Sequence, residues 1–480
     1  MAHAAVISLE EFKQARLHAD ARQQLHERFD RWLDALEERM PETTPTLDHL
    51  TQAVFARRHE LTSAITEALV EQTHHDVLDQ HTMRCPQCGH LLRTRGAVTR
   101  TVDTMVGTVS LRRPYFYCVS CRAGYAPLDD ALQLAMRHKQ WDMQRAGARL
   151  AAEVPYETAS ELFTELTGLS LSDHVLHEVV GECSHGLTVL DVSPTAAEIG
   201  QRVAQVATGR TWRPILVLAI DGADVPLRPE TAKGRRPGRK RTRAKRARWR
   251  GHWQEAKGFR FSLVDGERIV HLVSWHQVQR DEDLADALRQ VKDTGLVPEE
   301  QVRLCVVADG AKWIWTQVKT LFPSAVQILD YYHCSEHLHQ VASLQFGHHP
   351  EQASEWMEAT VARLFWGEVQ AVIDGLQSMQ AHDAQAAEEI RKLMGYLTNN
   401  QGRVDYGFAR KGGYPLGSGG IESAHKFIGH VRLKRSGAWW YVEKANHILA
   451  LRCAKYNGTF DRVFAVYKQR AMQSPGRTSL

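Results

Sequence analysis

Hydrophobic residues recur at helical spacing in the first 80 residues and again between residues 334 and 411. Clusters such as FDRWLDALEERM and LTSAITEALVEQ place apolar residues three and four positions apart, with no strand alternation. The later segment repeats this pattern in EWMEATVARLFWGEVQAVIDGL. The pattern therefore predicts a helical N-terminal region, residues 1–80, and a second helical segment, residues 334–411.

Strand-like and helix-like runs alternate between residues 206 and 333. Five apolar runs predict strands, in the order PILVLAI, FRFSLV, RIVHLVSW, VRLCVVA and AVQIL. Helical runs follow the third and the fourth of them. Three strands, a helix, a strand, a helix and a strand are typical of an α/β fold with a mixed sheet. Asp265-Gly266 separates the second and third strands and is explained as a hairpin turn.

The segment between these regions, residues 81–128, contains two CxxC pairs: Cys85 and Cys88 in CPQCGH, and Cys118 and Cys121 in CVSC. Four thiolates in two such pairs suit tetrahedral zinc. RTVDTMVGTVSLRRPYFYC alternates on both sides of Gly107, so a β-hairpin can bring the pairs together. The alternatives are a redox dithiol, which usually has one CxxC, and two disulfides, which are rare in the cytosol. We therefore predict a zinc ribbon that holds one structural Zn²⁺.

Residues 129–205 predict a further helical region. YETASELFTELTGLSLSDHVLHEVVGEC fits a helix, a turn at Gly168, and a second helix capped by Ser172, with Leu176 and Val180 facing inward. The length suits a helix-turn-helix, although many helical hairpins share it. The second helix has two histidines and three acids but no Lys or Arg, which argues against base reading from that helix.

Length and hydropathy limit the class of protein. A chain of 480 residues is too long for one hydrophobic core, so we expect two to four domains. The longest apolar run in a strand-like segment, Ile215 to Ile220, is far too short to cross a membrane. The first residues lack the basic start, long apolar middle and cleavage site of a secretory signal. We therefore expect a cytoplasmic protein with no membrane partner.

The small net charge of +4 hides an uneven distribution. Residues 233–250, KGRRPGRKRTRAKRARWR, hold 11 of the 60 basic residues and no acid, so the remainder has 49 basic against 56 acidic side chains, a net charge of −7. Such a run is solvated when free and typically binds a polyanion. Trp249 and Trp253 add aromatic surface for stacking. The run falls between the first and second predicted strands of the α/β region.

Two of the predicted strands are followed directly by Asp-Gly: Asp221 follows ILVLAI, and Asp309 follows LCVVA. Open α/β sheets place their sites at the carboxyl ends of strands, so these aspartates lie side by side if their strands are neighbours. Like charges at that distance repel unless a cation joins them, and carboxylate oxygens suit Mg²⁺ or Mn²⁺. Two such ions can bind the attacking and leaving oxygens of a phosphodiester.

Asp309 has a second interpretation. Asp-Gly is a common turn, and Asp is a favoured N-cap for the helix that begins near Ala311. Spacing alone does not separate a cap from an active-site residue. The cationic run in the same region favours the active-site interpretation, with phosphoryl transfer on nucleic acid as the chemistry.

Three motifs together resemble the catalytic triad of bacterial insertion-sequence transposases of the DDE type, among them the Kra family. They are AIDGADV with Asp221, VADGAKWIW with Asp309, and GSGGIESAHK with Glu422. The helical segment 334–411 resembles the α-helical insertion that some of these enzymes carry before the glutamate. RLKRSGAWW, just after the glutamate, is similar to the tail of the family. No part of the resemblance covers residues 1–80.

The resemblance implies a ribonuclease-H-like catalytic domain, residues 206–333 and 412–470, interrupted by the helical insertion. It implies that Asp221, Asp309 and Glu422 hold two Mg²⁺ (or Mn²⁺) ions. It also implies an activity, the cleavage of DNA at the ends of an insertion sequence followed by strand transfer.

Other acids compete for these roles. ILDYYHCSEHL, with Asp330 and His333, resembles the Asp-x-x-His motif of several DDE groups and implies a supporting pair. Asp330 also ends an apolar strand and could replace Asp309. Asp224 lies three residues beyond the first aspartate and fits a supporting role. Glu443 is an alternative third acid, although it lacks a glycine-rich approach.

We expect the partner to be double-stranded DNA in the nucleoid, both terminal repeats and target, bound by a homo-oligomer that is at least dimeric. A related nuclease or resolvase and a non-catalytic DNA-binding regulator are the other functions that stay open. The zinc ribbon and the candidate helix-turn-helix favour a transposase over a bare nuclease. The residues predicted to bind DNA are Arg235, Arg236, Arg239, Lys240, Arg241, Arg243, Lys245, Arg246, Arg248, Arg250, Lys434 and Arg435.

Overall fold

The structure is a computed structural model that describes residues 9–38, 44–229 and 250–473. The chain divides into two compact units. The first comprises Met1–Cys183 and Phe464–Leu480, and the second comprises Ser184–Val463. None of the helices in the described part of the chain is long and apolar enough to cross a membrane.

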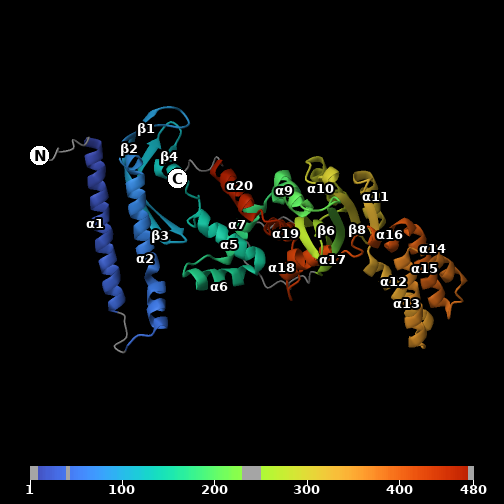
Figure 1. The fold of residues 1–480 in the computed structure, drawn as a ribbon. Helices are drawn as coiled ribbons and strands as arrows, with labels where there is room; N and C mark the ends of the chain where they lie inside the picture. Colours follow the sequence, from blue (N-terminus) through green and yellow to red (C-terminus); the bar gives the residue numbers. More distant parts are fainter. Residues whose placement is uncertain (1–8, 39–43, 230–249, 474–480) are drawn as a thin grey trace, which may run out of the picture. The chain divides into compact units, whose positions relative to one another are not determined.

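The first unit begins with two long antiparallel helices, α1 (Leu9–Glu37) and α2 (Leu47–Thr73), followed by the short α3 (His75–Leu78) (Figure 1). The Thr46 hydroxyl accepts a hydrogen bond from the amide of His49 and so starts α2. The indole of Trp32 on α1 donates to the carbonyl of Arg57 on α2 at 3.0 Å. The predicted helical pattern is therefore observed in the described residues of this region, 9–38 and 44–80, and residues 1–8 and 39–43 lie outside the described part of the chain.

A four-stranded antiparallel sheet follows, in the order β1-β2-β3-β4. Its strands are β1 (Thr82–Arg84), β2 (Leu91–Thr104), β3 (Gly107–Cys118) and β4 (Ala123–Tyr125). β2 and β3 form the predicted hairpin, and Thr104 pairs with Gly107 at the turn. Gly107 has a φ of +120°, which suits glycine, and a Cβ there would lie 2.9 Å from the carbonyl oxygen of His59 on α2.

Helices complete the first unit: α4 (Pro127–Ala131), α5 (Trp141–Glu153), α6 (Tyr156–Thr167), α7 (Asp173–Ser184) and part of α20 (Phe460–Gln473). The predicted helical hairpin is α6 and α7. Gly168 ends α6 with a φ of +69°, the amide of Val175 donates to the Ser172 hydroxyl, and Leu176 and Val180 are buried.

The second unit contains a five-stranded sheet in the order β7-β6-β5-β8-β9. β5 (Ile215–Leu227), β6 (His252–Asp265) and β7 (Arg268–Val278) are antiparallel neighbours, and β8 (Arg303–Ala308) and β9 (Val326–Leu329) run parallel to β5. α10 (Asp281–Asp293) and the short η1 (Glu299–Gln301) precede β8, and α11 (Lys312–Leu321) follows it. The chain order of strands and helices is the predicted one, and the fold is mixed α/β.

β5 is longer than the sequence predicts. The apolar run suggests that the strand ends at Asp221, but β5 continues to Leu227 and stays paired with β6 as far as His252. Its parallel neighbour β8 stops earlier, because Ala308 pairs with Ile220. β7 stays paired with β6 as far as Ala256, opposite Ala223, so β5 and β6 form a two-stranded extension over residues 224–227 and 252–255, which we call the hairpin ribbon. The predicted end of the first strand at Asp221 is therefore wrong. The predicted end of its neighbour, just before Asp309, is correct.

Helices precede and follow the strands of this sheet in the chain (Figure 1). Before β5 lie α8 (Val189–Val192) and α9 (Ala196–Ala207). After β9, the predicted helical segment comprises α12 (Tyr331–Phe346), α13 (Pro350–Trp366), α14 (Val369–Ser378), α15 (Ala384–Asn399), η2 (Gln401–Arg403) and α16 (Tyr406–Lys411). α17 (Gly419–Ala424), the π-helix η3 (His425–His430), α18 (Val431–Leu433) and α19 (Val442–Tyr456) then return to the sheet. α17 packs against β5 and β6, and α19 packs against β7.

Candidate functional sites

The first site is the cysteine cluster of the antiparallel sheet. The sulfur atoms of Cys85, Cys88, Cys118 and Cys121 all lie within 4.8 Å of one another. The Sγ atoms of Cys85 and Cys121 are 3.8 Å apart, and those of Cys88 and Cys118 are 3.5 Å apart. A tetrahedron with Zn–S bonds of about 2.3 Å has sulfur–sulfur edges of about 3.8 Å. The four cysteines, free of disulfides, could therefore hold a structural metal such as zinc.

Both CxxC turns have a similar backbone. The residue after the second cysteine of each pair is left-handed, Gly89 with a φ of +75° and Arg122 with a φ of +53°. In the first turn the amide of Gly89 donates to the carbonyl of Cys85 at 2.9 Å. The sequence places a glycine at only one of these two positions, so the similarity of the turns is visible only in the structure.

The protonation of the cluster favours a bound cation. Burial raises the pKa of the Cys85 thiol, but hydrogen bonds from the Tyr125 hydroxyl and from backbone amides outweigh it and bring the pKa to about 6. A hydrogen bond with Cys88, together with burial, raises the pKa of Cys121 to about 12. One thiolate therefore forms readily, and further ones repel it unless a cation neutralises the cluster. The Tyr125 hydroxyl lies 3.6 Å from the sulfur of Cys85.

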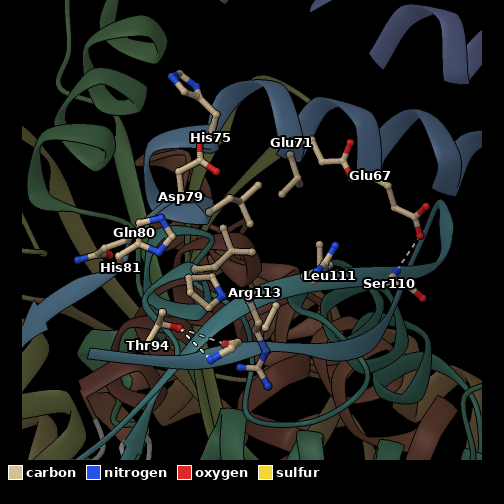
Figure 2. Close-up of a pocket in the computed structure, with 17 residues that line it drawn as sticks. Glu67, Glu71, His75, Asp79, Gln80, His81, Thr94, Ser110, Leu111 and Arg113 are labelled. Atoms are coloured by element: carbon tan, nitrogen blue, oxygen red, sulfur yellow. Dashed lines mark hydrogen bonds between the residues drawn. The ribbon is translucent and has the colours of Figure 1, made fainter. Parts of the chain in front are cut away.

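The first unit also contains an open groove between α2–α3 and the hairpin of β2 and β3, with a volume of about 460 Å³. Figure 2 shows Glu67, Glu71 and Asp79 on the helical wall and Arg113 on the strand wall. The carboxylate of Glu67 accepts a hydrogen bond from the amide of Ser110 at 2.8 Å, which ties α2 to β3. The groove has walls of mixed charge, and none of the sequence-predicted site residues lines it.

The second site lies at the sheet of the second unit, where three parallel strands each deliver an aspartate. Ile220 pairs with Ala308, and Ala308 pairs with Leu329, so Asp221, Asp309 and Asp330 follow three residues of one row across β5, β8 and β9. The predicted neighbourhood of the first two aspartates is therefore observed.

The pKa of the Asp309 carboxyl group is raised in this neighbourhood. Burial raises the pKa of its carboxyl group, and the negative charges of Asp221 and Asp330 raise it further, against a hydrogen bond from the amide of Ala311 and the charge of His333. The amide of Ala311 donates to Oδ1 of Asp309 at 2.8 Å. α11 begins only at Lys312 and has Ala311 at its N-cap position. Asp309 therefore shapes the turn before the helix rather than capping the helix.

Asp330 has a different environment from the other two aspartates. It is completely buried, and its Oδ1 accepts hydrogen bonds from the amides of Tyr332 and His333, at 2.6 and 3.2 Å, at the start of α12. Its Oδ2 accepts a hydrogen bond from the amide of Ser418 in the glycine-rich turn. Both carboxylate oxygens thus accept hydrogen bonds from backbone amides. Asp330 therefore caps α12 and tethers the glycine-rich turn at Ser418. His333 lies beside Glu336, with Nδ1 3.6 Å from the carboxylate.

The glycine-rich turn presents Glu422 on α17. Asp330 holds the turn at Ser418, and the buried guanidinium of Arg260 on β6 donates to the carbonyl of Gly420 at 2.5 Å. Ile421 is fully buried, whereas Glu422 is exposed. The two tethers fix the backbone on either side of the turn, so the structure explains why Glu422 can be delivered by a short helix.

His425 is a site residue that the sequence reasoning missed. It lies one turn after Glu422, it is 4% exposed, and its Nε2 is 3.3 Å from Oδ2 of Asp221. The ring of His276 on β7 stacks edge-on behind it, with the ring centroids 4.9 Å apart. Burial holds the pKa of His276 well below its usual range, and the charge of His425 adds to this. The histidine three residues after the glutamate, in ESAH, is the signal that could have identified it.

A glycine makes room for this pair of histidines. Asp221, Gly258 and His276 are direct cross-strand neighbours on β5, β6 and β7. A Cβ on Gly258 would lie 2.2 Å from a ring carbon of His276, so only glycine lets the imidazole cross β6 towards His425. A carboxylate on β5, a glycine on β6 and an imidazole on β7 therefore form one row across the sheet, under α17 and η3.

The π-helix η3 continues directly from α17. Arg452 on α19 is buried and donates to the carbonyls of Phe427 and Ile428, the latter at 2.7 Å. π-helical turns are rare and occur frequently at functional sites. Here the widened turn begins at His425, and the carbonyls inside it are satisfied by a side chain of the neighbouring helix.

The structure does not bring all predicted ligands to one point. Within the described part of the chain, the four cysteines are the one group of three or more such side chains placed so that it could hold a metal ion. Asp221, Asp309 and Glu422 therefore share one end of the sheet without closing into a cluster. Asp224, for which a supporting role was expected, is exposed on the hairpin ribbon, and the alternative third acid Glu443 lies 3.7 Å from Nε2 of His447 on α19.

Of the residues predicted to bind DNA, most lie outside the described part of the chain: Arg235, Arg236, Arg239, Lys240, Arg241, Arg243, Lys245, Arg246 and Arg248. The remaining three, Arg250, Lys434 and Arg435, are exposed. Arg250 precedes β6, and the other two follow α18.

The fold and the sites define a mixed α/β protein with a four-cysteine cluster in one unit and a row of aspartates in the other. The chain belongs to UPF0236, an uncharacterised protein family whose model matches residues 46–470. This match includes the cysteine cluster, the five-stranded sheet and the helices around it. A search of curated proteins finds no match.

Proposed function

We propose that the protein is a DNA transposase of the DDE type, whose second unit contains a ribonuclease-H-like catalytic domain. The strand order supports this fold, since three antiparallel strands are followed by two strands parallel to the first, with helices between them. The helices from α12 to α16 would then be an insertion between the second and third acids of the triad.

One observation carries the proposal. Asp221 and Asp309 follow paired residues of adjacent parallel strands, and Glu422 enters on a helix that packs against β5 and β6 at the same sheet. Carboxylates from two neighbouring strands and one helix suit a site for divalent cations. The cationic run in the β5–β6 connection supplies a reason for a polyanionic substrate.

The electrostatics of Asp309 fit a divalent cation. Its raised pKa reports a buried carboxylate beside other negative charges, which a cation would neutralise. Asp221, Asp309 and Glu422 would be the residues that hold Mg²⁺ or Mn²⁺. Two bound ions would supply charge stabilisation for the attacking and leaving oxygens of a DNA phosphodiester.

Other residues of the chain would prepare the site. Asp330 and Arg260 fix the turn before Glu422 through Ser418 and Gly420. His425 restrains the carboxylate of Asp221 from the side of η3. These contacts would reduce the rearrangement needed when DNA and ions bind, which is the usual contribution of residues behind a metal site.

The remaining expectations are part of the same proposal. The cysteine cluster would hold structural Zn²⁺ and keep the ribbon folded. The substrates would be double-stranded terminal repeats and target DNA. A homo-oligomer, at least dimeric on DNA, would bring two ends together in the cytoplasm.

The test is a cleavage and joining assay with the full chain, Mg²⁺, and a supercoiled plasmid that carries the DNA flanking its gene. The transposase proposal expects nicks at defined ends and covalent joining to a target. Cleavage without joining would favour a nuclease or resolvase. Stable DNA binding without cleavage in Mg²⁺ or Mn²⁺ would favour a non-catalytic regulator. Asp309→Asn should remove both reactions and keep DNA binding.

A further inference from the structure

The hairpin ribbon ends in an aromatic and cationic surface. Trp253 on β6 is 57% exposed, and its ring lies edge-on to the ring of Trp439, with the centroids 6.1 Å apart. Nζ of Lys434 lies 6.0 Å from the centre of the Trp253 ring. We call these three residues the tryptophan platform.

Trp439 is fixed in this position by the backbone around it. A Cβ on Gly251 would lie 2.1 Å from a ring carbon of Trp439, so the glycine lets the indole lie against the backbone just before β6. The amide of the next residue, Trp440, donates to the carbonyl of Pro226 at 3.0 Å, and its carbonyl accepts from the amide of Arg228 at 2.9 Å. The segment that carries Trp439 is therefore bound to the end of β5, and the exposed indole has a rigid neighbour.

The charges around the platform have one dominant sign. Lys434 of the platform is exposed, and so are Arg435, the next residue in the chain, and Arg250, three residues before Trp253. Two acids lie on the hairpin ribbon: Glu255, whose carboxylate is 3.8 Å from Nζ of Lys257, and its cross-strand neighbour Asp224, which is exposed. An exposed aromatic ring beside ammonium and guanidinium groups suits a ligand that is flat, aromatic and anionic, which describes a nucleotide.

We propose that the tryptophan platform stacks an unpaired base of the DNA strand on which the protein acts. This inference rests on the proposed function for the identity of the nucleic acid, but not on the carboxylates. A base inside a duplex is covered on both faces, so only an unpaired nucleotide can stack on a protein ring. Trp253 would supply the ring, Trp439 would hold it edge-on, and Lys434 would contact the adjacent phosphate.

The position of the platform suits such a role. Trp253 pairs with Pro226, which lies five residues along β5 from Asp221. At the rise of an antiparallel strand this is about 17 Å. A DNA strand held at the carboxylates would therefore reach the platform within a few nucleotides of the reacting phosphate.

The experiment compares two synthetic DNAs bound to the full chain. One is a blunt duplex, and the other is the same duplex with an unpaired extension that contains 2-aminopurine, whose fluorescence is quenched on stacking. Trp253→Ala should weaken binding of the extended DNA by roughly 5- to 150-fold, the range for loss of one stacked base. It should also abolish the quenching, and it should change blunt-duplex binding by less than about twofold.

Two variants serve as controls. Trp253→Phe keeps an aromatic face and should retain most of the affinity and the quenching. Trp366→Ala removes another exposed tryptophan, 74% exposed on α13, and should change neither DNA. Equal losses on both DNAs, or quenching that persists in Trp253→Ala, would overturn the inference.

The outcome is separable from that of the proposed function. Asp309→Asn should keep the 2-aminopurine signal, because the carboxylates take no part in stacking. A chain that stacks the base through Trp253 but never cleaves DNA would refute the transposase and leave the platform in place. A chain that cleaves element ends, and whose Trp253→Ala variant still quenches 2-aminopurine, would refute the platform and leave the transposase proposal in place.

Discussion

Nε2 of His425 lies 3.3 Å from the carboxylate of Asp221, although the two residues are more than two hundred positions apart in the sequence. The contact joins η3 to the middle of β5, and the ring of His276 packs edge-on against the ring of His425. An aspartate that would hold a cation thus has its free rotation limited by a buried imidazole.

His425→Ala should impair the site without unfolding the protein. Loss of a residue that orients a metal ligand typically lowers metal affinity or activity by about 10- to 100-fold. We expect weaker Mn²⁺ binding, measured by calorimetry, together with slower cleavage. His174→Ala, which removes an exposed histidine from α7, is the control. Unchanged Mn²⁺ affinity in His425→Ala would show that the imidazole only fills space.

Asp309→Asn should stabilise the cation-free protein at neutral pH. The raised pKa means that the folded state holds its proton more tightly than the unfolded state, so ionisation of Asp309 costs stability once the pH exceeds the unfolded value of about 3.9. The thermal midpoint of the variant should therefore exceed that of the wild type at pH 7 in chelator. The difference should vanish near pH 3, and Mg²⁺ should raise the midpoint of the wild type more.

Asp330→Ala should destabilise the second unit. It would leave three backbone amides, those of Tyr332, His333 and Ser418, without their buried acceptor, at a cost of at least about 2 kcal/mol. Asp330→Asn keeps one oxygen for the α12 amides but can present an NH₂ group to Ser418. Two donors then face each other at Ser418, so the unfolding free energy should lie between those of Asp330→Ala and wild type, and activity should be lost, as measured by urea unfolding and cleavage. Equal unfolding free energies for Asp330→Ala and wild type would contradict the tether.

The cysteine cluster should bind one zinc ion per chain. Cys85→Ser should lose this zinc and unfold the antiparallel sheet, because ligand binding and folding are coupled in such sites. Tyr125→Phe should retain zinc with lower affinity, since it removes the hydroxyl group beside the Cys85 sulfur. Metal analysis of protein purified without chelator checks both. Cys183→Ser, at a buried cysteine outside the cluster, should keep full zinc occupancy.

Much of the fold follows from local pattern. The helices, the β2–β3 hairpin and the succession of strands and helices along the second unit are each encoded by periodicity and turn residues within short windows. The cysteine cluster is equally local in its signal, because each CxxC pair is a single turn. The neighbourhood of Asp221 and Asp309 required one further assumption, that their strands are adjacent, and β5 and β8 are indeed paired.

The remainder depends on contacts between distant segments. The extension of β5 beyond Asp221 buries Val225 and Leu227, but it begins at Asp-Gly, a common turn signal, and the pairing with β6 overrides that signal. Asp330 ends its strand in the same way as Asp309, yet its role is set by Ser418, nearly ninety residues later. His425 and His276 look like isolated histidines until the sheet brings them together.

Gly258 gives this arrangement a consequence for the evolution of the family. Any side chain at that position would displace His276, and a displaced His276 would no longer support the imidazole next to Asp221. Substitutions at the two positions should therefore occur together. A relative with a side chain in place of Gly258 should have a smaller residue in place of His276, so covariation between them would record a constraint that neither residue shows alone.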